Sequence, residues 1–475
     1  MLVSSKETRR SFLQQFATWG AVAGGSGLGA TPIFGAEPES CAGPRPPATA
    51  IPWKPDTNPI LPRPAASTLT DADVTRLRNA YQALRNLTVS QPDDPRGWLE
   101  QADKHCWNCG GGLDQQAGEE IHGSWLFLPW HRALLYFHER ILGALINDPS
   151  LRLAYWDWDN PPHRSVPDAW LTPHDSSNPL WDANRSAVSG SQLPNSLVGS
   201  EIMNPIVGAS TFARFGGTSG SAGNLENGPH GGVHIWCGDT TLQSAGADMG
   251  LLDTAAQDPL FWAHHANIDR LWSVWLGAAA SHKNPTSSAW LKHKFTFWDE
   301  RKRWVSITVA DVINISNNLR YTYGRVAAPE VTRNPVVTEL TVDSGGAIRL
   351  PAAMRNTLLG PQGNRSKTTT LRLARVMLPP GATGIYRIVV NTPPAIAAAD
   401  VAGTANDLGY VAIVPKTSKD GQTHRHPDLT VDLDVTGQLP KLLEQNGKLS
   451  LSVVPMAANR SSTQLTYQSV YLIER

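Results

Sequence analysis

The chain has no excess charge of either sign, because its 41 Lys and Arg residues balance its 41 Asp and Glu residues. A neutral chain gives no reason to expect nucleic acid or an anionic membrane as a partner. The weakly apolar stretch at residues 16–30 is too short and too rich in glycine to span a membrane. We therefore expect no membrane anchor, and no internal repeat is apparent.

Cysteine is scarce, with four residues in 475: Cys41, Cys106, Cys109 and Cys237. The CxxC spacing of Cys106 and Cys109 could indicate a metal-binding or redox motif. No second CxxC and no thioredoxin-like strand pattern accompany it, which argues against that interpretation. Cys237 has no evident partner, so we expect a buried free thiol.

The length of 475 residues exceeds what one compact core accommodates, so we expect two folded domains behind a signal segment. Thr8-Arg9-Arg10-Ser11-Phe12-Leu13 reads as a twin-arginine export signal. A disordered basic N-terminus is the alternative. The predicted divisions are a signal segment (1–36), a helical domain (37–325), a linker (326–345) and a C-terminal domain (346–475). Export predicts a periplasmic or secreted protein.

The predicted fold class is multidomain: a mainly α domain with a four-helix bundle, followed by an all-β antiparallel sandwich. Helices are expected at about 70–88, with Thr70 or Asp71 as the N-cap, at about 129–147, at about 258–276, and around the HxxxH pair of residues 230–234. Residues 160–225 are rich in Pro, Gly, Ser and Asn, so a long loop is expected there. Short apolar runs between turn signals predict the sandwich after residue 346.

Six histidines form two triads in tryptophan- and phenylalanine-rich sequence. They are His105, His122 and His131 in the first triad, and His230, His234 and His265 in the second. A site made only of imidazole has no carboxylate or thiolate charge and suits a borderline or soft redox metal, which predicts two copper ions.

Residues in and beside the second triad indicate how its imidazoles are arranged. His230 and His234 stand four residues apart and so share one helical face. Asp269, four residues after His265, could accept the other imidazole proton and fix the tautomer. His264 is an adjacent competitor of His265.

Four runs carry a resemblance to a known family. They are HCWNC (105–109), HGSWLFLPWHR (122–132), PHGGVHIW (229–236) and DPLFWAHHANIDRLW (258–272). The sequence resembles the tyrosinase and catechol oxidase family of type 3 copper proteins, in particular plant-type polyphenol oxidases with a C-terminal shielding domain. The resemblance continues through residues 289–304, 321–323 and 385–393, and so covers nearly the whole mature chain.

The resemblance implies an enzyme that uses dioxygen to oxidise o-diphenols to o-quinones, latent until the C-terminal domain is removed. It leaves open whether monophenols are also ortho-hydroxylated. In the family's last motif the second of two adjacent histidines is the ligand, which selects His265 over His264. The implied partners are a phenolic substrate and dioxygen. The twin-arginine route carries proteins that are already folded, so it predicts in addition a copper-loading partner before export.

The resemblance also implies two covalent links beside the first triad. Cys106 would pair with Cys41, tying an extended N-terminal segment to the core. Cys109 would bond through its sulfur to the ring of His122 as a thioether. Such a link would hold the imidazole in one orientation and make Cys109 unavailable as a thiol.

Four further positions acquire roles from the family. Glu226 is the candidate for assisting deprotonation of the substrate. Gly231 stands where strong monophenol hydroxylases often carry Asn, which puts such activity in doubt. Leu252 stands where plant enzymes often carry a Phe that overhangs the second copper, so the entrance should admit bulkier phenols. Ile235 is expected to line the same entrance.

Two other function classes stay open. An o-aminophenol oxidase uses the same pair of metals on a different donor. A dioxygen carrier of the haemocyanin kind uses the same six ligands without turnover. Assays on catechols and o-aminophenols separate these alternatives.

Overall fold

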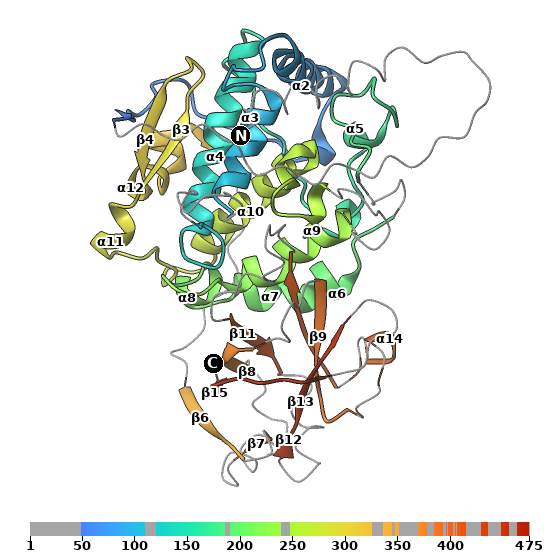
Figure 1. The fold of residues 1–475 in the computed structure, drawn as a ribbon. Coiled ribbons are helices and arrows are strands. Elements are labelled where there is room, and N and C mark those ends of the chain that lie inside the picture. Colours follow the sequence, from blue (N-terminus) through green and yellow to red (C-terminus); the bar gives the residue numbers. More distant parts are fainter. Residues whose placement is uncertain are drawn as a thin grey trace, which may run out of the picture.

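The computed structural model describes two bodies, drawn one above the other in Figure 1. The helical body comprises residues 49–109, 120–185, 191–238 and 248–324. The β body comprises residues 336–343, 347–350, 369–377, 384–392, 396, 398–401, 404, 406–414, 429–435, 448–455 and 463–474. The predicted signal segment lies outside the described residues.

Four longer helices form the framework of the helical body. They are α2 (Asp71–Ser90), α3 (Trp98–Trp107), α4 (Phe127–Leu145) and α10 (Pro259–Ala278). Thr70 caps α2 in a capping box with Asp73, and Asp258 caps α10 by accepting from the Leu260 N–H. The structure thus confirms the helices predicted near 70–88, 129–147 and 258–276.

Shorter helices fill the rest of this body. They are η1 (Ala66–Thr68), η2 (Pro161–His163), α5 (Asp168–Leu171), α6 (Asn195–Val198), α7 (Ser200–Val207), α8 (Phe212–Phe215), η3 (Glu226–His230), α9 (Gly231–Cys237), η4 (Asp248–Gly250), η5 (Ala255–Gln257), α11 (Ser288–Leu291), α12 (Val309–Val312) and η6 (Ile315–Leu319). The prediction of a long loop over 160–225 was therefore wrong in part. Helices of one or two turns are too short to show a helical period, and buried side chains such as Trp170 and Phe212 hold them on the core.

The start of the described chain pairs with the end of the helical body. Strand β1 (Ile51–Pro52) runs parallel to β4 (Trp304–Thr308), which pairs with β3 (Lys294–Trp298). Strand β2 (Leu61–Pro62) runs parallel to β5 (Tyr321–Thr322). The extended N-terminal arm is therefore held against the segment that closes this body.

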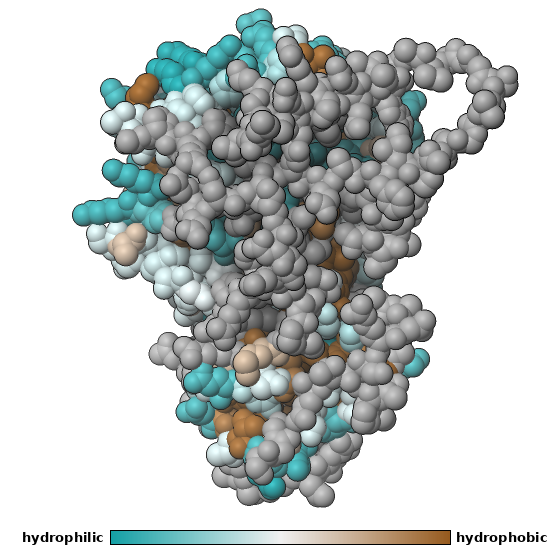
Figure 2. All heavy atoms as spheres, viewed as in Figure 1, coloured by the Kyte–Doolittle hydropathy of each residue, from teal (hydrophilic) through white to brown (hydrophobic). Residues whose placement is uncertain are grey.

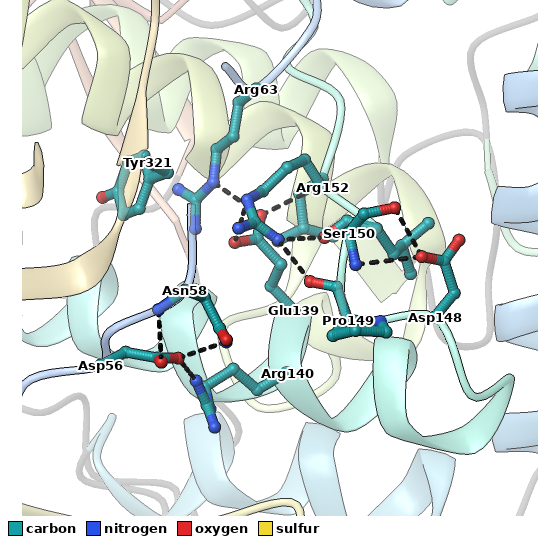
Figure 3. A network of polar contacts seen from close by, with 12 residues as sticks. Asp56, Asn58, Arg63, Glu139, Arg140, Asp148, Pro149, Ser150, Arg152 and Tyr321 are labelled. Carbon is teal, nitrogen blue, oxygen red and sulfur yellow. Dashed lines mark hydrogen bonds and ion pairs between the residues drawn. The ribbon is translucent and has the colours of Figure 1, made fainter. Parts of the chain in front are cut away.

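A buried polar network reinforces that closure (Figure 3). The Arg63 guanidinium donates to Glu139 at 2.8 Å and lies 3.7 Å over the Tyr321 ring. Asp269 accepts from Arg132 at 2.5 Å, from Arg63 at 3.3 Å, and from the hydroxyls of Tyr321 and Tyr323 at 2.6 and 2.5 Å. Buried charges need such partners, because an unpaired one is costly to remove from water.

The β body is an antiparallel sandwich, as predicted. One sheet has the order β10-β9-β13-β14 and the other β11-β8-β15-β6-β7-β12. The elements are β6 (Val336–Val342), β7 (Ile348–Arg349), β8 (Thr369–Val376), β9 (Gly384–Val390), α14 (Ala398–Val401), β10 (Asp407–Ile413), β11 (Leu429–Asp434), β12 (Lys448–Leu449), β13 (Leu451–Pro455), β14 (Thr463–Gln464) and β15 (Ser469–Glu474). Strand β6 lies within residues 326–345, which the sequence analysis placed in the linker. Its alternating pattern pairs it with β15.

Strand β10 joins the two bodies. Its Tyr410 and Ala412 belong to the same buried hydrophobic cluster as the helices. The Tyr410 hydroxyl donates to the backbone carbonyl of Leu197 at 2.7 Å. In Figure 1 the strands beside β9 reach up to α7 and α9. The β body is therefore docked on the helical body through a buried contact.

Figure 2 shows mostly hydrophilic residues along the upper edge of the helical body, with brown apolar residues farther down, toward and within the β body. Among the described residues, no helix combines the length and apolar character needed to cross a membrane.

Candidate metal centre

Six elements bring the predicted histidines together. His105 lies in the last turn of α3, His122 in a turn before α4, and His131 in α4. His230 ends η3, His234 lies in α9, and His265 lies in α10. The bundle around the site therefore uses α3 and not α2, the helix assigned to it from the sequence. Helix α2 packs behind α3 and α4.

The first triad is compact. The ring centroids of His105 and His122 are 5.4 Å apart, those of His122 and His131 5.3 Å, and those of His105 and His131 5.5 Å. His105 and His131 are buried, at 0% and 2% exposure. Three imidazoles at these separations can converge on one ion between them.

The second triad has the same dimensions and faces the first. The ring centroid of His230 lies 4.7 Å from that of His234 and 5.1 Å from that of His265, and the centroids of His234 and His265 are 5.4 Å apart. Across the gap, the rings of His131 and His265 stack at 4.2 Å. The two triads therefore form one centre, with three imidazoles available for each of two neighbouring ions.

Burial favours the neutral form in five of the six imidazoles, because it lowers their pKa. Burial, and then the neighbouring histidines, lower the pKa of His105, His230 and His265 well below the usual value. Burial lowers the pKa of His234 to about 4. A neutral imidazole keeps a lone pair on one nitrogen, which is the state that binds a metal.

Backbone carbonyls orient several rings for that role. Nδ1 of His131 lies 2.9 Å from the Phe127 carbonyl, and Nδ1 of His234 lies 2.8 Å from the Met249 carbonyl. Each Nδ1 must donate its proton, so Nε2 carries the lone pair. Nε2 of His131 is buried without a hydrogen-bond partner in the described part of the chain. An all-imidazole set with a directed but unused lone pair fits copper.

His264 lies as near to the second triad as a ligand does. Its ring centroid is 5.6 Å from that of His230 and 5.0 Å from that of His234. One of its ring nitrogens lies close enough to nitrogens of His230, His234 and His265 for the four to share a metal ion. Unlike His265, it has no ring contact with the first triad among the described ring pairs. Distance alone does not separate the two neighbours.

Asp269 does not hold His265, which corrects the sequence interpretation. Its carboxylate is engaged by Arg63, Arg132 and the Tyr321 and Tyr323 hydroxyls. Burial raises its pKa, but the two guanidinium groups and the tyrosine hydroxyls outweigh this and lower it. Every hydrogen bond described for the Asp269 carboxylate therefore goes to the closing network, and none goes to His265.

Glu226 bridges two of the sequence motifs. It begins η3, four residues before His230, and its Oε1 accepts from the Gly123 N–H at 2.6 Å. Gly123 follows His122, so the carboxylate ties the turn of the first triad to the helix of the second. Glu226 is buried beside the centre at 8% exposure.

The predicted entrance residues meet the β body. Leu252 forms a small buried cluster with Cys109, Val414 and the partly buried Ile235. Val414 directly follows β10. A Cβ on Gly231 would lie 3.1 Å from the Ala412 side chain and carbonyl, so the absent side chain lets β10 approach.

Three of the four cysteines, Cys106, Cys109 and Cys237, lie within the described residues. Cys41 lies outside them, so its pairing with Cys106 stays a prediction. The Cys109 thiol donates to the His105 carbonyl at 2.9 Å, and its sulfur groups with ligand atoms of His105 and His122 within 4.8 Å of one another. Cys237 is a buried free thiol whose pKa is raised by burial.

Sequence reasoning missed several residues that shape the centre. The ring centroid of Phe127 lies 4.6 Å from that of His230, and the ring centroid of Phe261 lies 4.2 Å from that of His265. Met249 contributes a backbone carbonyl, which leaves no trace in a side-chain pattern. Phe127 and Phe261 lie inside the quoted motifs, so their position could have been anticipated.

Known proteins match this chain in sequence. Residues 95–207 and 175–278 match the common central domain of tyrosinase, and residues 284–336 match the polyphenol oxidase middle domain. The chain is 36% identical over 315 residues to "Polyphenol oxidase latent form, chloroplastic" of Prunus armeniaca, covering 60% of this chain and 52% of that protein. The chain spans about half the length of the curated relatives it matches.

Solved structures match it in fold. Grenache (Vitis vinifera) polyphenol oxidase is 31% identical with a TM-score of 0.54, covering 63% of this chain and 95% of that one. A recombinantly expressed latent aurone synthase (polyphenol oxidase) is 25% identical with a TM-score of 0.69, covering 90% and 93%. The second match extends over the β body as well as the helical body.

Proposed function

The chain belongs to the tyrosinase family, and from that premise we propose that it oxidises o-diphenols to o-quinones with dioxygen at a pair of copper ions. One observation carries the proposal: six imidazoles, five of them buried and that of His122 partly buried, stand in two facing triads. When bound, the copper pair supplies the redox chemistry that reduces dioxygen. Each o-diphenol loses two electrons and two protons, so two of them reduce one dioxygen to two waters.

The protein's own groups hold and shield this chemistry. The proposed ligands are His105, His122 and His131 for one ion and His230, His234 and His265 for the other. Phe127 and Phe261 pack against the imidazoles and exclude water from the centre. Glu226 lies beside the second triad, where its carboxylate would take the phenol proton. A Cys109–His122 thioether would fix one ring.

We further propose that the β body keeps the enzyme latent. The support is that Val414 reaches the cluster of Leu252, Ile235 and Cys109 at the proposed entrance, while Tyr410 and Ala412 pack on the helical body. A phenol would need the space that Val414 occupies. The glycines at 231 and 232 support the same fit, because a Cβ on Gly232 would come within 2.8 Å of the Tyr410 hydroxyl.

The test compares substrates before and after cleavage of the chain just beyond Gly324. Oxidation of a catechol, an o-aminophenol and tyrosine is followed by quinone absorbance. We expect catechol oxidation to rise after cleavage, with tyrosine turned over weakly because residue 231 is Gly. Faster turnover of the o-aminophenol would favour the aminophenol oxidase, and dioxygen binding without turnover would favour the carrier. An intact chain that is already fully active would rule out the lid.

Leu252 is proposed to set the size of the phenol. Leu252→Phe should lower the rate on a bulky 4-tert-butylcatechol relative to unsubstituted catechol by about 5-fold, because a larger side chain narrows the entrance. The matched control is Leu251→Phe, since Leu251 lies outside the entrance cluster. Unchanged relative rates in the Leu252 variant would contradict the gate.

The remaining proposals concern the N-terminal segment and its link to the helical body. We propose that residues 1–36 direct twin-arginine export after a partner protein loads copper, and that Cys41 pairs with Cys106. Mass spectrometry of the exported protein checks both: it should show loss of the signal segment and a mass lower by four hydrogens, two for the disulfide and two for the thioether. Reduction should restore only the two hydrogens of the disulfide.

A further inference from the structure

Two adjacent histidines compete for one place at the second triad. His264 and His265 are both completely buried in α10, at 0% exposure each. Both have a ligand atom grouped with those of His230 and His234. If both could bind, the second ion would have two alternative ligands and no single geometry.

The indole of Trp158 distinguishes them. Its Nε1 donates a hydrogen bond to Nδ1 of His264 at 3.1 Å, and both side chains are fully buried. An indole N–H is only ever a donor, so Nδ1 of His264 must present its lone pair to Trp158. The one proton of the neutral imidazole then sits on Nε2, and no lone pair is left for a metal.

Two of the histidines proposed as ligands, His131 and His234, have the opposite arrangement. Nδ1 of His131 and Nδ1 of His234 face the carbonyls of Phe127 and Met249, at 2.9 and 2.8 Å. A carbonyl only accepts, so these Nδ1 atoms carry the proton and each Nε2 keeps its lone pair. In His131, His234 and His264 the partner of Nδ1 therefore determines whether Nε2 has a lone pair for a metal.

The position of Trp158 is itself fixed against α10. The neighbouring Trp156 N–H donates to the carbonyl of Ala263 at 3.0 Å, one residue before His264. The Trp156 indole points elsewhere and donates to the His163 carbonyl at 2.8 Å. The segment of Trp156 and Trp158 thus presents one indole N–H to His264 and none to His265.

We propose that Trp158 is a positioning residue that withholds His264 from the second metal ion and so assigns that ion to His265. The proposal rests on the dinuclear centre of the proposed function. It concerns binding of the ion, so it can be tested without any turnover of a phenol.

The first test measures copper binding by the full-length apo chain, titrated with Cu(I) against a competing chelator. His265→Ala should lose affinity for the second copper by more than the roughly 100-fold typical for loss of an outer partner of a ligand. Adding Trp158→Phe removes the indole N–H, frees the lone pair of His264 and should recover at least about 10-fold of that affinity. Trp156→Phe in the His265→Ala background is the matched control and should recover none.

Two outcomes of that titration would overturn the proposal. One is that His265→Ala alone keeps the affinity of the parent for the second copper. The other is that Trp158→Phe recovers no more affinity than Trp156→Phe.

The second test needs no variant and so does not depend on any variant folding. Nitrogen NMR of the apo chain labelled at histidine reports which ring nitrogen carries the proton. We expect the proton on Nε2 for His264 and on Nδ1 for His131 and His234. A proton on Nδ1 of His264 would refute the assignment. Absence of catechol oxidation would defeat the proposed function and leave both of these readouts unchanged.

Discussion

The two bodies of the molecule are stabilised by different means. The helical body buries charge around its centre: Arg63, Arg132 and Asp269 are all within 2% exposure. The core of the β body is almost entirely Leu, Ile and Val. All 17 tryptophans precede residue 305 and so belong to the sequence of the first body or the segment before it. The helical body thus surrounds its imidazole centre with a network of fixed polar groups, whereas the β body has an apolar core with the ion pair of Arg387 and Asp407 buried beside it.

The largest effect should come from removing one charge of the buried network. Asp269→Asn keeps the shape but removes the anionic partner of Arg132 and leaves Arg63 with Glu139 alone, so the helical body should lose about 3–5 kcal/mol. Tryptophan fluorescence during urea unfolding reports this body selectively. The exposed Asp168→Asn is the control. A loss no greater than that of the control would show that the network is dispensable.

In the β body the sensitive feature should be apolar volume. Leu472, at 0% exposure in β15, fills the sandwich core, and Leu472→Ala should cost about 3 kcal/mol through the cavity it leaves. Hydrogen exchange of the β15 amides measures it. Val342→Ala, at an exposed site in β6, should have little effect. If Leu472→Ala also shifted the unfolding transition seen by tryptophan fluorescence by the same free energy, the two bodies would unfold as one cooperative unit.

A pH-dependent ion pair gives a smaller effect within the helical body. Burial raises the pKa of Asp94, but the hydrogen bonds from Arg96 and Lys302 together outweigh burial and lower the pKa to about 2. A carboxyl with a depressed pKa stabilises the fold above its ordinary value of 3.8 and loses that contribution as the pH falls toward 2. Asp94→Asn should cost about 1–2 kcal/mol near neutral pH.

Urea unfolding followed by tryptophan fluorescence, near neutral pH and again near the acid limit of stability, checks this. The difference between Asp94→Asn and the parent should shrink on acidification. An equal difference at both pH values would mean that the contribution is not electrostatic. Asp168→Asn again serves as the control.

The smallest effect should lie at the contact between the bodies. Tyr410→Phe removes the hydrogen bond to the Leu197 carbonyl and should weaken docking by about 1 kcal/mol, raising the undocked population about 5-fold. Catechol oxidation by the intact chain should rise by a similar factor. Tyr471→Phe, on β15 of the β body, should leave the rate unchanged. No rise in the Tyr410 variant would show that the hydroxyl does not hold the lid.

Much of the centre could be predicted from the sequence because its signals are local. The caps at Thr70 and Asp258 and the spacing of His230 and His234 are read within one helical turn. The choice between His264 and His265 could be made only by analogy, since it depends on Trp158, more than a hundred residues away.

Other features could not be predicted for the same reason. Val414 follows an apolar strand that resembles every other strand of the sandwich, so nothing local marks it as the residue that reaches the entrance. Strand β6 was assigned to the linker because a single short strand acquires meaning only from its partner β15. Non-local pairing is the information that a one-dimensional pattern omits.

The pairing of β2 with β5 brings the two ends of the helical body side by side. Leu61 is in register with Tyr321, so the polypeptide nearly completes a ring before it continues into the β body. A chain whose residue 324 was linked to residue 60 by a short loop, with new ends opened elsewhere on the surface, should therefore keep its histidine centre.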